Sequence, residues 1–157
     1  MGRYKKPFVM YKIRTMVAGA EKLQSRLKRQ NEADGPVFKI RNDPRYTRVG
    51  KILSRSALDE TPQLINVILG EMSLVGPRPL PLSEAQKVPK KYETRFSVLP
   101  GMTSNWVIRG SHRLTFKEWM RLDVEYARKH PLFKDLYILL YTFILILRVI
   151  SLNGTGG

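Results

Sequence analysis

The dipeptide Asp59-Glu60, directly before a predicted helix, is the feature that most constrains this chain. Thr61 suits the N-cap of that helix and Pro62 its first position, where the missing N–H of proline costs nothing. Apolar side chains surround the helix on nearly all sides over residues 64–69, which is typical of a helix that is buried or faces lipid. Carboxylates at this end lie next to the positive pole of the helix dipole, where a phosphate can also bind. The sequence therefore predicts an acidic pair fixed to a rigid element, as a catalytic site requires.

Basic side chains are expected close to this pair. Arg55 lies about one helical turn before it, which is close enough to share a site. Arg78 follows it in a stretch with three prolines in five positions, which cannot be helical and holds Arg78 in a stiff loop suited to binding phosphate or carboxylate. Lys12 and Arg14 share one face of a strand predicted over residues 8–14. Such cations are more often solvent-exposed surface charges than ligand-binding residues, so a surface role and a role in the site both stay open.

The composition indicates an ordered domain with an anionic partner. A length of 157 residues predicts a single domain over 1–157. The net charge of +15 implies a polyanionic partner such as nucleic acid, anionic lipid or a phosphorylated substrate. The chain contains no cysteine, which excludes disulfides, thiolate chemistry and cysteine-ligated metals and is in keeping with a cytosolic location.

The hydrophobic pattern predicts an α/β fold in which helices dominate. Besides the strand near 8–14, short strands are expected near 37–40 and 73–76. About six helices are expected, near 17–31, 45–56, 62–69, 83–92, 116–129 and 132–150. The last contains the uncharged run 136–147, about 18 Å of helix, which is too short to cross a bilayer. It is expected to be either a core helix or a helix that lies in the membrane interface.

Asp123 falls in the middle of the apolar face of the helix that begins at Phe116. An ionised carboxylate in that position needs a partner. Pairing with one of the many arginines and a supporting role in the catalytic site are both open.

An acidic pair beside several cations favours phosphoryl chemistry with Mg²⁺. A carboxylate can bind this cation or attack phosphorus, while cations bind the phosphate oxygens. The candidates for phosphate binding are Lys12, Arg14, Arg55 and Arg78. The alternative is a basic nucleic-acid-binding module. The charge favours it, but no binding motif is present and the prolines around Arg78 present cations poorly to a duplex.

Several strings resemble the bacterial sugar transferase family, the monotopic polyprenyl-phosphate phosphoglycosyl transferases. The similarity covers almost the whole chain in order, and its central block is long enough to be specific. The strings are 6–16 (KPFVMYKIRTM), 58–67 (LDETPQLINV), 70–79 (GEMSLVGPRP), 100–103 (PGMT) and 122–126 (LDVEY).

The resemblance implies a nucleoside-diphosphate sugar donor such as a UDP-sugar, a polyprenyl-phosphate acceptor such as undecaprenyl phosphate, and Mg²⁺. Such enzymes start exopolysaccharide, O-antigen and other glycan assembly. The resemblance implies that Asp59 is the nucleophile, which forms a covalent phosphosugar adduct, and that Asp59 also binds Mg²⁺. Glu60 would assist the metal or proton transfer, and Lys12, Arg55 and Arg78 would bind phosphates.

Two departures from the family pattern affect what is expected. Family members usually carry a hydrophobic re-entrant helix upstream of the string at 6–16, and this sequence begins after it. Attachment to the anionic cytoplasmic face of the bacterial inner membrane would then depend on the basic surface and the helix at 132–150. Val107 and Ser111 stand where the family has Gln and Arg, so donor specificity, and activity itself, can differ. An inactive membrane-surface fragment of this fold is a further alternative, and the sequence specifies neither the sugar, the polyprenol nor the oligomeric state.

Overall fold

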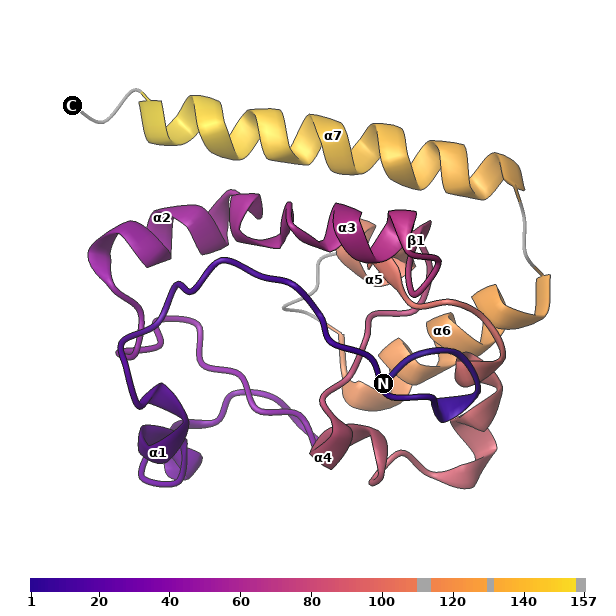
Figure 1. Ribbon diagram of the computed structural model, residues 1–157, viewed down its shortest axis with the longest axis horizontal. Coiled ribbons are helices and arrows are strands. Elements are labelled where there is room, and N and C mark those ends of the chain that lie inside the picture. Colours follow the sequence, from indigo (N-terminus) through magenta and orange to yellow (C-terminus); the bar gives the residue numbers. More distant parts are fainter. Residues whose placement is uncertain (110–113, 130–131, 155–157) are drawn as a thin grey trace.

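The computed structural model describes residues 1–109, 114–129 and 132–154, and helices dominate it (Figure 1). The long helix α7 (Leu132–Gly154) runs along one side of the molecule, the side on which α2 (Arg48–Arg55) and α3 (Gln63–Ile68) also lie. The short helices α1 (Ala20–Gln24) and α4 (Leu82–Ala85) lie on the opposite side. The predicted helix-dominated α/β class is confirmed.

A two-stranded parallel sheet lies near the middle of the chain. Strand β1 (Ser73–Val75) pairs with β2 (Gly101–Thr103), with Ser73 opposite Gly101 and Val75 opposite Thr103. Gly101 lies against Gly76, the residue after β1. A Cβ at Gly101 would lie 2.0 Å from the backbone nitrogen of Gly76, so only glycine fits at position 101. The strand predicted near 73–76 is confirmed, whereas no strand was predicted at the position of β2.

The core forms where α6 (Phe116–Lys129) packs against the 3₁₀ helix η4 (Lys90–Ser97) and against α7. Thr115 and Glu118 begin α6 with a capping box, in which the backbone N–H of Thr115 donates to Glu118 Oε2 at 2.9 Å. One buried cluster comprises Leu80, Ala85, Val88, Tyr92, Phe96, Trp119, Met120 and Val124, and the other comprises Val75, Val98, Tyr126, Ala127 and Ile138.

Two predicted strands are wrong. Residues 8–14 form an extended segment without a partner strand, because side chains and a single carbonyl take its hydrogen bonds. Asn66 Oδ1 accepts from the N–H of Tyr11, and the Asn66 amide donates to the carbonyl of Val9. Residues 37–40 are also irregular, since the N–H of Lys39 donates to the Asn31 side chain instead of to a strand.

Two predicted helices are shorter than expected. Residues 17–31 contain only α1 and a 3₁₀ turn, η2 (Lys28–Gln30). Residues 83–92 are divided into α4 and the start of η4, because Pro89 between them cannot continue a helix. A further short helix, α5 (Asn105–Ile108), follows β2. Helix α2 begins later than the predicted start near residue 45, after an N-cap at Thr47.

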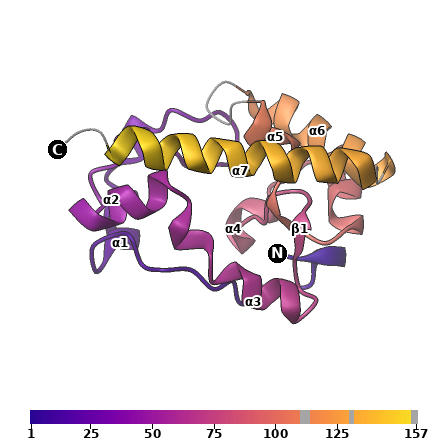
Figure 2. The same ribbon diagram turned by 90° about the horizontal axis from the view of Figure 1, so that it is seen from above.

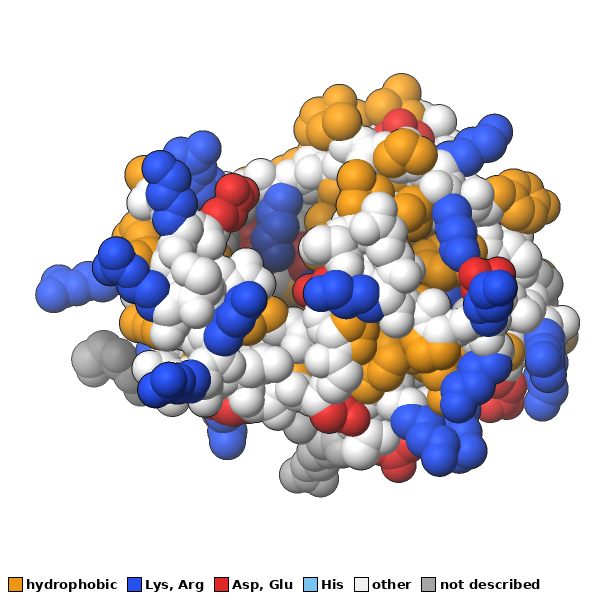
Figure 3. Space-filling view, turned by 90° about the horizontal axis from the view of Figure 1, so that it is seen from below, with side chains coloured by type: hydrophobic (Ala, Val, Ile, Leu, Met, Phe, Trp, Pro, Cys, Tyr) orange, Lys and Arg blue, Asp and Glu red, His pale blue; other side chains and the backbone are white. Residues whose placement is uncertain are grey.

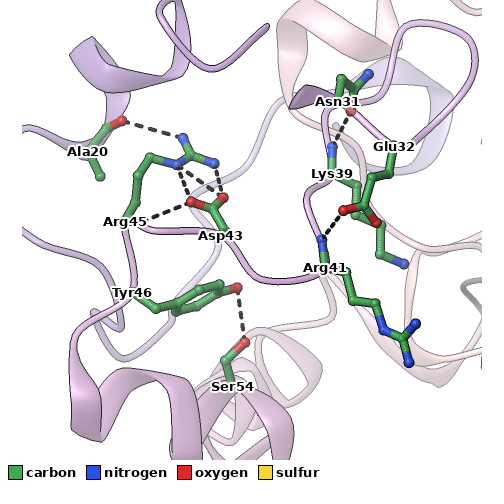
Figure 4. A network of polar contacts seen from close by, with 9 residues as sticks. All are labelled: Ala20, Asn31, Glu32, Lys39, Arg41, Asp43, Arg45, Tyr46 and Ser54. Atoms are coloured by element: carbon green, nitrogen blue, oxygen red, sulfur yellow. Dashed lines mark hydrogen bonds and ion pairs between the residues drawn. The ribbon is translucent and has the colours of Figure 1, made fainter. Parts of the chain in front are cut away.

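A buried ion pair fixes the loop that leads into α2 (Figure 4). Arg45 binds both carboxylate oxygens of Asp43, with Nη2 at 2.6 Å from Oδ2, and it also donates to the carbonyl of Ala20 at 3.4 Å. The Arg45 guanidinium lies over the ring of Phe38. In the same view, Glu32 accepts from the N–H of Arg41, so side chains hold this loop in place of a strand ladder.

Helix α3, which was expected either to be buried or to face lipid, is not a core element. Its polar residues Gln63 and Asn66 are buried, whereas Leu64, Ile65 and Ile68 are exposed, Ile68 to 85%. We call ten of the exposed apolar residues on α2, α3 and α7 the apolar face; they are Val49, Ile52, Leu64, Ile65, Ile68, Leu136, Leu140, Phe143, Ile144 and Leu147. Figures 1 and 2 place the three helices along the same side of the molecule. Within the residues described, no helix combines the length and the apolar character needed to cross a membrane.

Candidate active site

Asp59 lies in a 3₁₀ turn, η3 (Leu58–Glu60), between α2 and α3. Ala57 adopts a left-handed conformation with φ of 57°, which turns the chain away from α2 and into η3. The Asp59 residue is only 1% exposed. The predicted N-cap at Thr61 is wrong, because Thr61 has helical backbone angles and its hydroxyl donates to the carbonyl of Leu58. The acidic pair is therefore held by a turn before α3 and not by capping of that helix.

Lys12 forms an ion pair with Asp59. Its Nζ lies 3.0 Å from Asp59 Oδ2 and 3.2 Å from Glu60 Oε1, and it donates a hydrogen bond to Glu60. The extended segment that carries Lys12 is fixed by the N–H of Ile13, which donates to the carbonyl of Asp59 at 2.9 Å. A nucleophile candidate and its counter-ion are thus joined through both backbone and side chains.

Arg78 reaches the same acidic pair from the proline-rich loop. Its Nη2 lies 3.6 Å from Glu60 Oε1, and its guanidinium stands over the ring of Trp106 at 5.4 Å from the centroid. Glu60 therefore lies between Lys12 and Arg78. The structure brings together four predicted site residues, Lys12, Asp59, Glu60 and Arg78, whose roles stay predictions.

Arg14 and Arg55 are placed differently. Both side chains are exposed, and neither forms an ion pair with another described residue. Arg14 lies two positions after Lys12 but forms no ion pair with Asp59 or Glu60. Their predicted role in binding phosphates is neither supported nor excluded by this arrangement.

Sequence reasoning missed Lys39 and the part played by Trp106. Lys39 Nζ lies 5.1 Å from the centroid of the Trp106 ring, which is also the ring under Arg78. Burial, followed by the charge of Arg78, lowers the pKa of Lys39. Trp106 in turn stacks on Trp119 at 5.2 Å between ring centroids. Lys39 belongs to an irregular loop, so no local pattern could have placed it near Arg78.

Asp123 has the partner that its buried position requires. Arg95 donates to Asp123 Oδ2 from Nη2 at 2.8 Å and from Nε at 3.1 Å. Arg95 Nη2 also donates to the backbone carbonyl of Arg78 at 2.8 Å. Burial raises the pKa of Asp123 from 3.8 to about 6, because it outweighs the attraction of Arg95. A carboxyl whose pKa is higher in the folded state makes the protein less stable as the pH rises from about 4 to about 6.

The donor set at Asp59 suits a divalent cation that is shared with a substrate. Among the described residues, no group of three or more His, Cys, Asp or Glu side chains surrounds a common point. Asp59 Oδ2 is buried and accepts no hydrogen bond, although Lys12 is nearby. Mg²⁺ is typically bound by one or two carboxylates together with substrate phosphates. Asp59 and Glu60 could hold the ion in this way.

Basic side chains extend well beyond the acidic pair. Figure 3 shows the side of the molecule opposite α7, where Lys and Arg side chains are widely spread and several border a hollow that contains acidic side chains. A surface with this excess of positive charge attracts anionic substrates.

Comparisons with known proteins identify the family. The family model for the bacterial sugar transferases matches residues 1–149. Galactosyl transferase CpsE of Streptococcus agalactiae serotype III is 39% identical over 100% of this chain and 34% of its own length. Undecaprenyl-phosphate galactose phosphotransferase of Salmonella typhimurium is 35% identical over 94% of the chain and 32% of its own length. UDP-glucose:undecaprenyl-phosphate glucose-1-phosphate transferase of Caulobacter vibrioides is 35% identical over 87% of the chain.

The chain therefore belongs to the bacterial sugar transferase family, as its motifs predict. It spans about a third of the length of the first two of these relatives.

Replacing Lys12 with Ala should lower the free energy of unfolding by about 1–3 kcal/mol, because a buried carboxylate loses its counter-ion. The matched control is Lys5→Ala, which breaks an ion pair of 2.6 Å with Glu93 that is open to solvent. The control should change stability far less. Urea denaturation of the three proteins measures both effects, and equal losses would show that Asp59 does not depend on Lys12.

Proposed function

We propose that this chain transfers a sugar phosphate from a nucleoside-diphosphate sugar to a polyprenyl phosphate. The donor class proposed is the UDP-sugars. The observation that carries the proposal is the buried carboxylate of Asp59 with Lys12 at 3.0 Å, beside a Glu60 that Lys12 and Arg78 both approach. The names of the relatives support both substrates, since one is a UDP-glucose:undecaprenyl-phosphate glucose-1-phosphate transferase. Products of this kind begin exopolysaccharide, O-antigen or lipopolysaccharide synthesis.

In the first half of the reaction, a carboxylate oxygen of Asp59 attacks the phosphorus that carries the sugar. The bond from that phosphorus to the bridging oxygen breaks, and the nucleoside monophosphate leaves with the electron pair. A covalent aspartyl phosphosugar remains on the protein. Lys12 covers Asp59 in the free protein, so the incoming phosphate takes over the ammonium group and uncovers the carboxylate.

In the second half, an oxygen of the polyprenyl phosphate attacks the same phosphorus and Asp59 departs as a free carboxylate. Two anionic substrates meet one carboxylate, so repulsion must be offset by fixed cations. Lys12 and Arg78 supply them, while Arg14 and Arg55 stay predicted phosphate ligands at the exposed edge. Mg²⁺, when held by Asp59 and Glu60 with the donor phosphates, would neutralise charge that develops on the leaving group.

UMP release tests this function. The chain, incubated with Mg²⁺, undecaprenyl phosphate and a panel of UDP-sugars, should release UMP with at least one donor. Asp59→Asn should release none, because an amide cannot act as the nucleophile. Glu125→Gln, an exposed change on α6, should leave the rate unchanged. The same assay is run on the chain fused behind a membrane-anchoring helix. If neither protein releases UMP with any donor, the result contradicts the proposal and favours an inactive fragment.

We further propose that the apolar face rests on an anionic membrane, at the cytoplasmic side of the bacterial inner membrane where nucleotide sugars are available. Its residues stay exposed on three helices that lie on one side of the molecule (Figure 2). Exposed apolar area on this scale marks an interaction surface, and the net charge of +15 suits anionic lipid. A lipid acceptor would then reach the site without leaving the membrane.

Flotation with phosphatidylglycerol vesicles tests this placement. The protein should bind at low salt and detach partly as salt is raised. The variant Leu136→Ser/Leu140→Ser/Phe143→Ser should bind about tenfold more weakly, because it removes apolar contacts with the bilayer. The control Leu23→Ser/Leu82→Ser changes exposed residues on α1 and α4, which lie on the opposite side. Absence of binding, or an equal loss in the control, would contradict the placement.

A further inference from the structure

We propose that Arg95, anchored by Asp123, is a positioning residue that fixes the backbone of Arg78 and so directs the Arg78 guanidinium toward Glu60. The contribution of this arrangement to turnover rests on the proposed function. Its effect on the loop that carries Arg78 does not.

The contacts of Arg95 join two parts of the chain. Arg95 belongs to η4, its partner Asp123 to α6, and the side chains are 2% and 3% exposed. A single nitrogen, Arg95 Nη2, lies 2.8 Å from Asp123 Oδ2 and 2.8 Å from the carbonyl oxygen of Arg78. The carboxylate therefore sets the direction in which Arg95 donates to the loop.

The backbone of the loop around Arg78 has little freedom, so a restraint on one of its carbonyls also restrains the neighbouring residues. Pro77 and Pro79 flank Arg78 and limit its backbone angles. The carbonyl of Pro77 accepts from the N–H of Gly101 at 2.9 Å, so β2 holds one side of the loop. The Arg95 bond holds the next carbonyl. With two successive carbonyls bound, the direction of the Arg78 side chain is determined largely by the backbone.

The side chain of Arg78 needs this support because its own contacts are loose. Its Nη2 is 3.6 Å from Glu60 Oε1, which is longer than a hydrogen bond, and 42% of the side chain is exposed. Its other contact is the face of Trp106, over which a guanidinium can slide. Small displacements of a charged group that binds a transition state reduce rates strongly.

Stability alone does not account for a buried pair at this place. Replacing a buried ion pair by apolar residues of similar volume is often neutral or stabilising. Burial raises the pKa of Asp123, so ionising this carboxyl is less favourable in the folded protein than in water. What the pair supplies, and apolar residues could not, is a directed donor for the carbonyl of Arg78.

A double-mutant cycle tests the proposal through the rate of UMP release with a donor that the wild-type protein uses. Arg78→Ala should lower kcat about 100-fold, with a smaller change in KM. Arg95→Lys keeps a charge beside Asp123, but its shorter side chain is not expected to reach Asp123 Oδ2 and the carbonyl of Arg78 together, and it should lower kcat about 10-fold or more. Because Arg95 acts through Arg78, the double variant should be no slower than Arg78→Ala alone. Losses that multiply, or a normal kcat in Arg95→Lys, would overturn the proposal.

The matched control is Arg45→Lys. Arg45 also pairs with a buried carboxylate, that of Asp43, and donates to a backbone carbonyl, that of Ala20 (Figure 4), but it is not one of the site residues. Its kcat, measured where the protein is folded, should stay within about threefold of wild type. A loss as large as that in Arg95→Lys would show general destabilisation and overturn the assignment.

A second readout does not need activity. Amide hydrogen exchange of Gly101, whose N–H donates to the carbonyl of Pro77 beside Arg78, should be at least tenfold faster in Arg95→Lys and unchanged in Arg45→Lys. Wild-type protein without UMP release but with this exchange pattern would refute the proposed function and support the restraint. Unchanged exchange in Arg95→Lys would overturn the restraint itself.

Discussion

A carboxylate that is removed from water must be paired, and in this protein the pairing of Asp59 with Lys12 determines how the N-terminal segment lies. To bring Lys12 to η3, the chain before α1 runs extended across the molecule and binds the carbonyl of Asp59 and the side chain of Asn66. Glu60 then joins this pair to Arg78. The buried pair Arg95–Asp123 in turn restrains the backbone of Arg78 through a hydrogen bond to its carbonyl.

The same arrangement explains why α3 carries its polar residues inside. Asn66 must be buried to hold the extended segment, since it binds both the N–H of Tyr11 and the carbonyl of Val9. The opposite surface of α3 is then left apolar and open, as are parts of α2 and α7. A protein that places its acidic pair and its apolar face on neighbouring elements is suited to a reaction between a water-soluble donor and a lipid acceptor.

Local patterns predicted the parts of this structure that depend on neighbouring residues. The capping box of α6, strand β1 and the stiff loop at Arg78 all follow from short motifs, and the family motifs indicated Asp59, Glu60 and Lys12. The strand at 8–14 could not be distinguished from an extended segment, because alternation in sequence does not say whether a partner strand exists. Arg95 and Lys39 lie 17 and 39 positions from Arg78, and only folding of η4 and the 31–41 loop brings them close. The exposure of α3 was open at the level of sequence, because an apolar helix suits both a core and a membrane.

Intact-protein mass spectrometry gives the most direct measurement of whether Asp59 is the nucleophile. The protein is mixed with Mg²⁺ and a UDP-sugar that supports UMP release, without polyprenyl phosphate. We expect a mass gain equal to the sugar phosphate, located by peptide mapping on Asp59, that disappears when undecaprenyl phosphate is added and never forms in Asp59→Asn. Transfer to the lipid without any adduct, or substantial transfer by Asp59→Asn, would contradict a covalent reaction at this carboxylate.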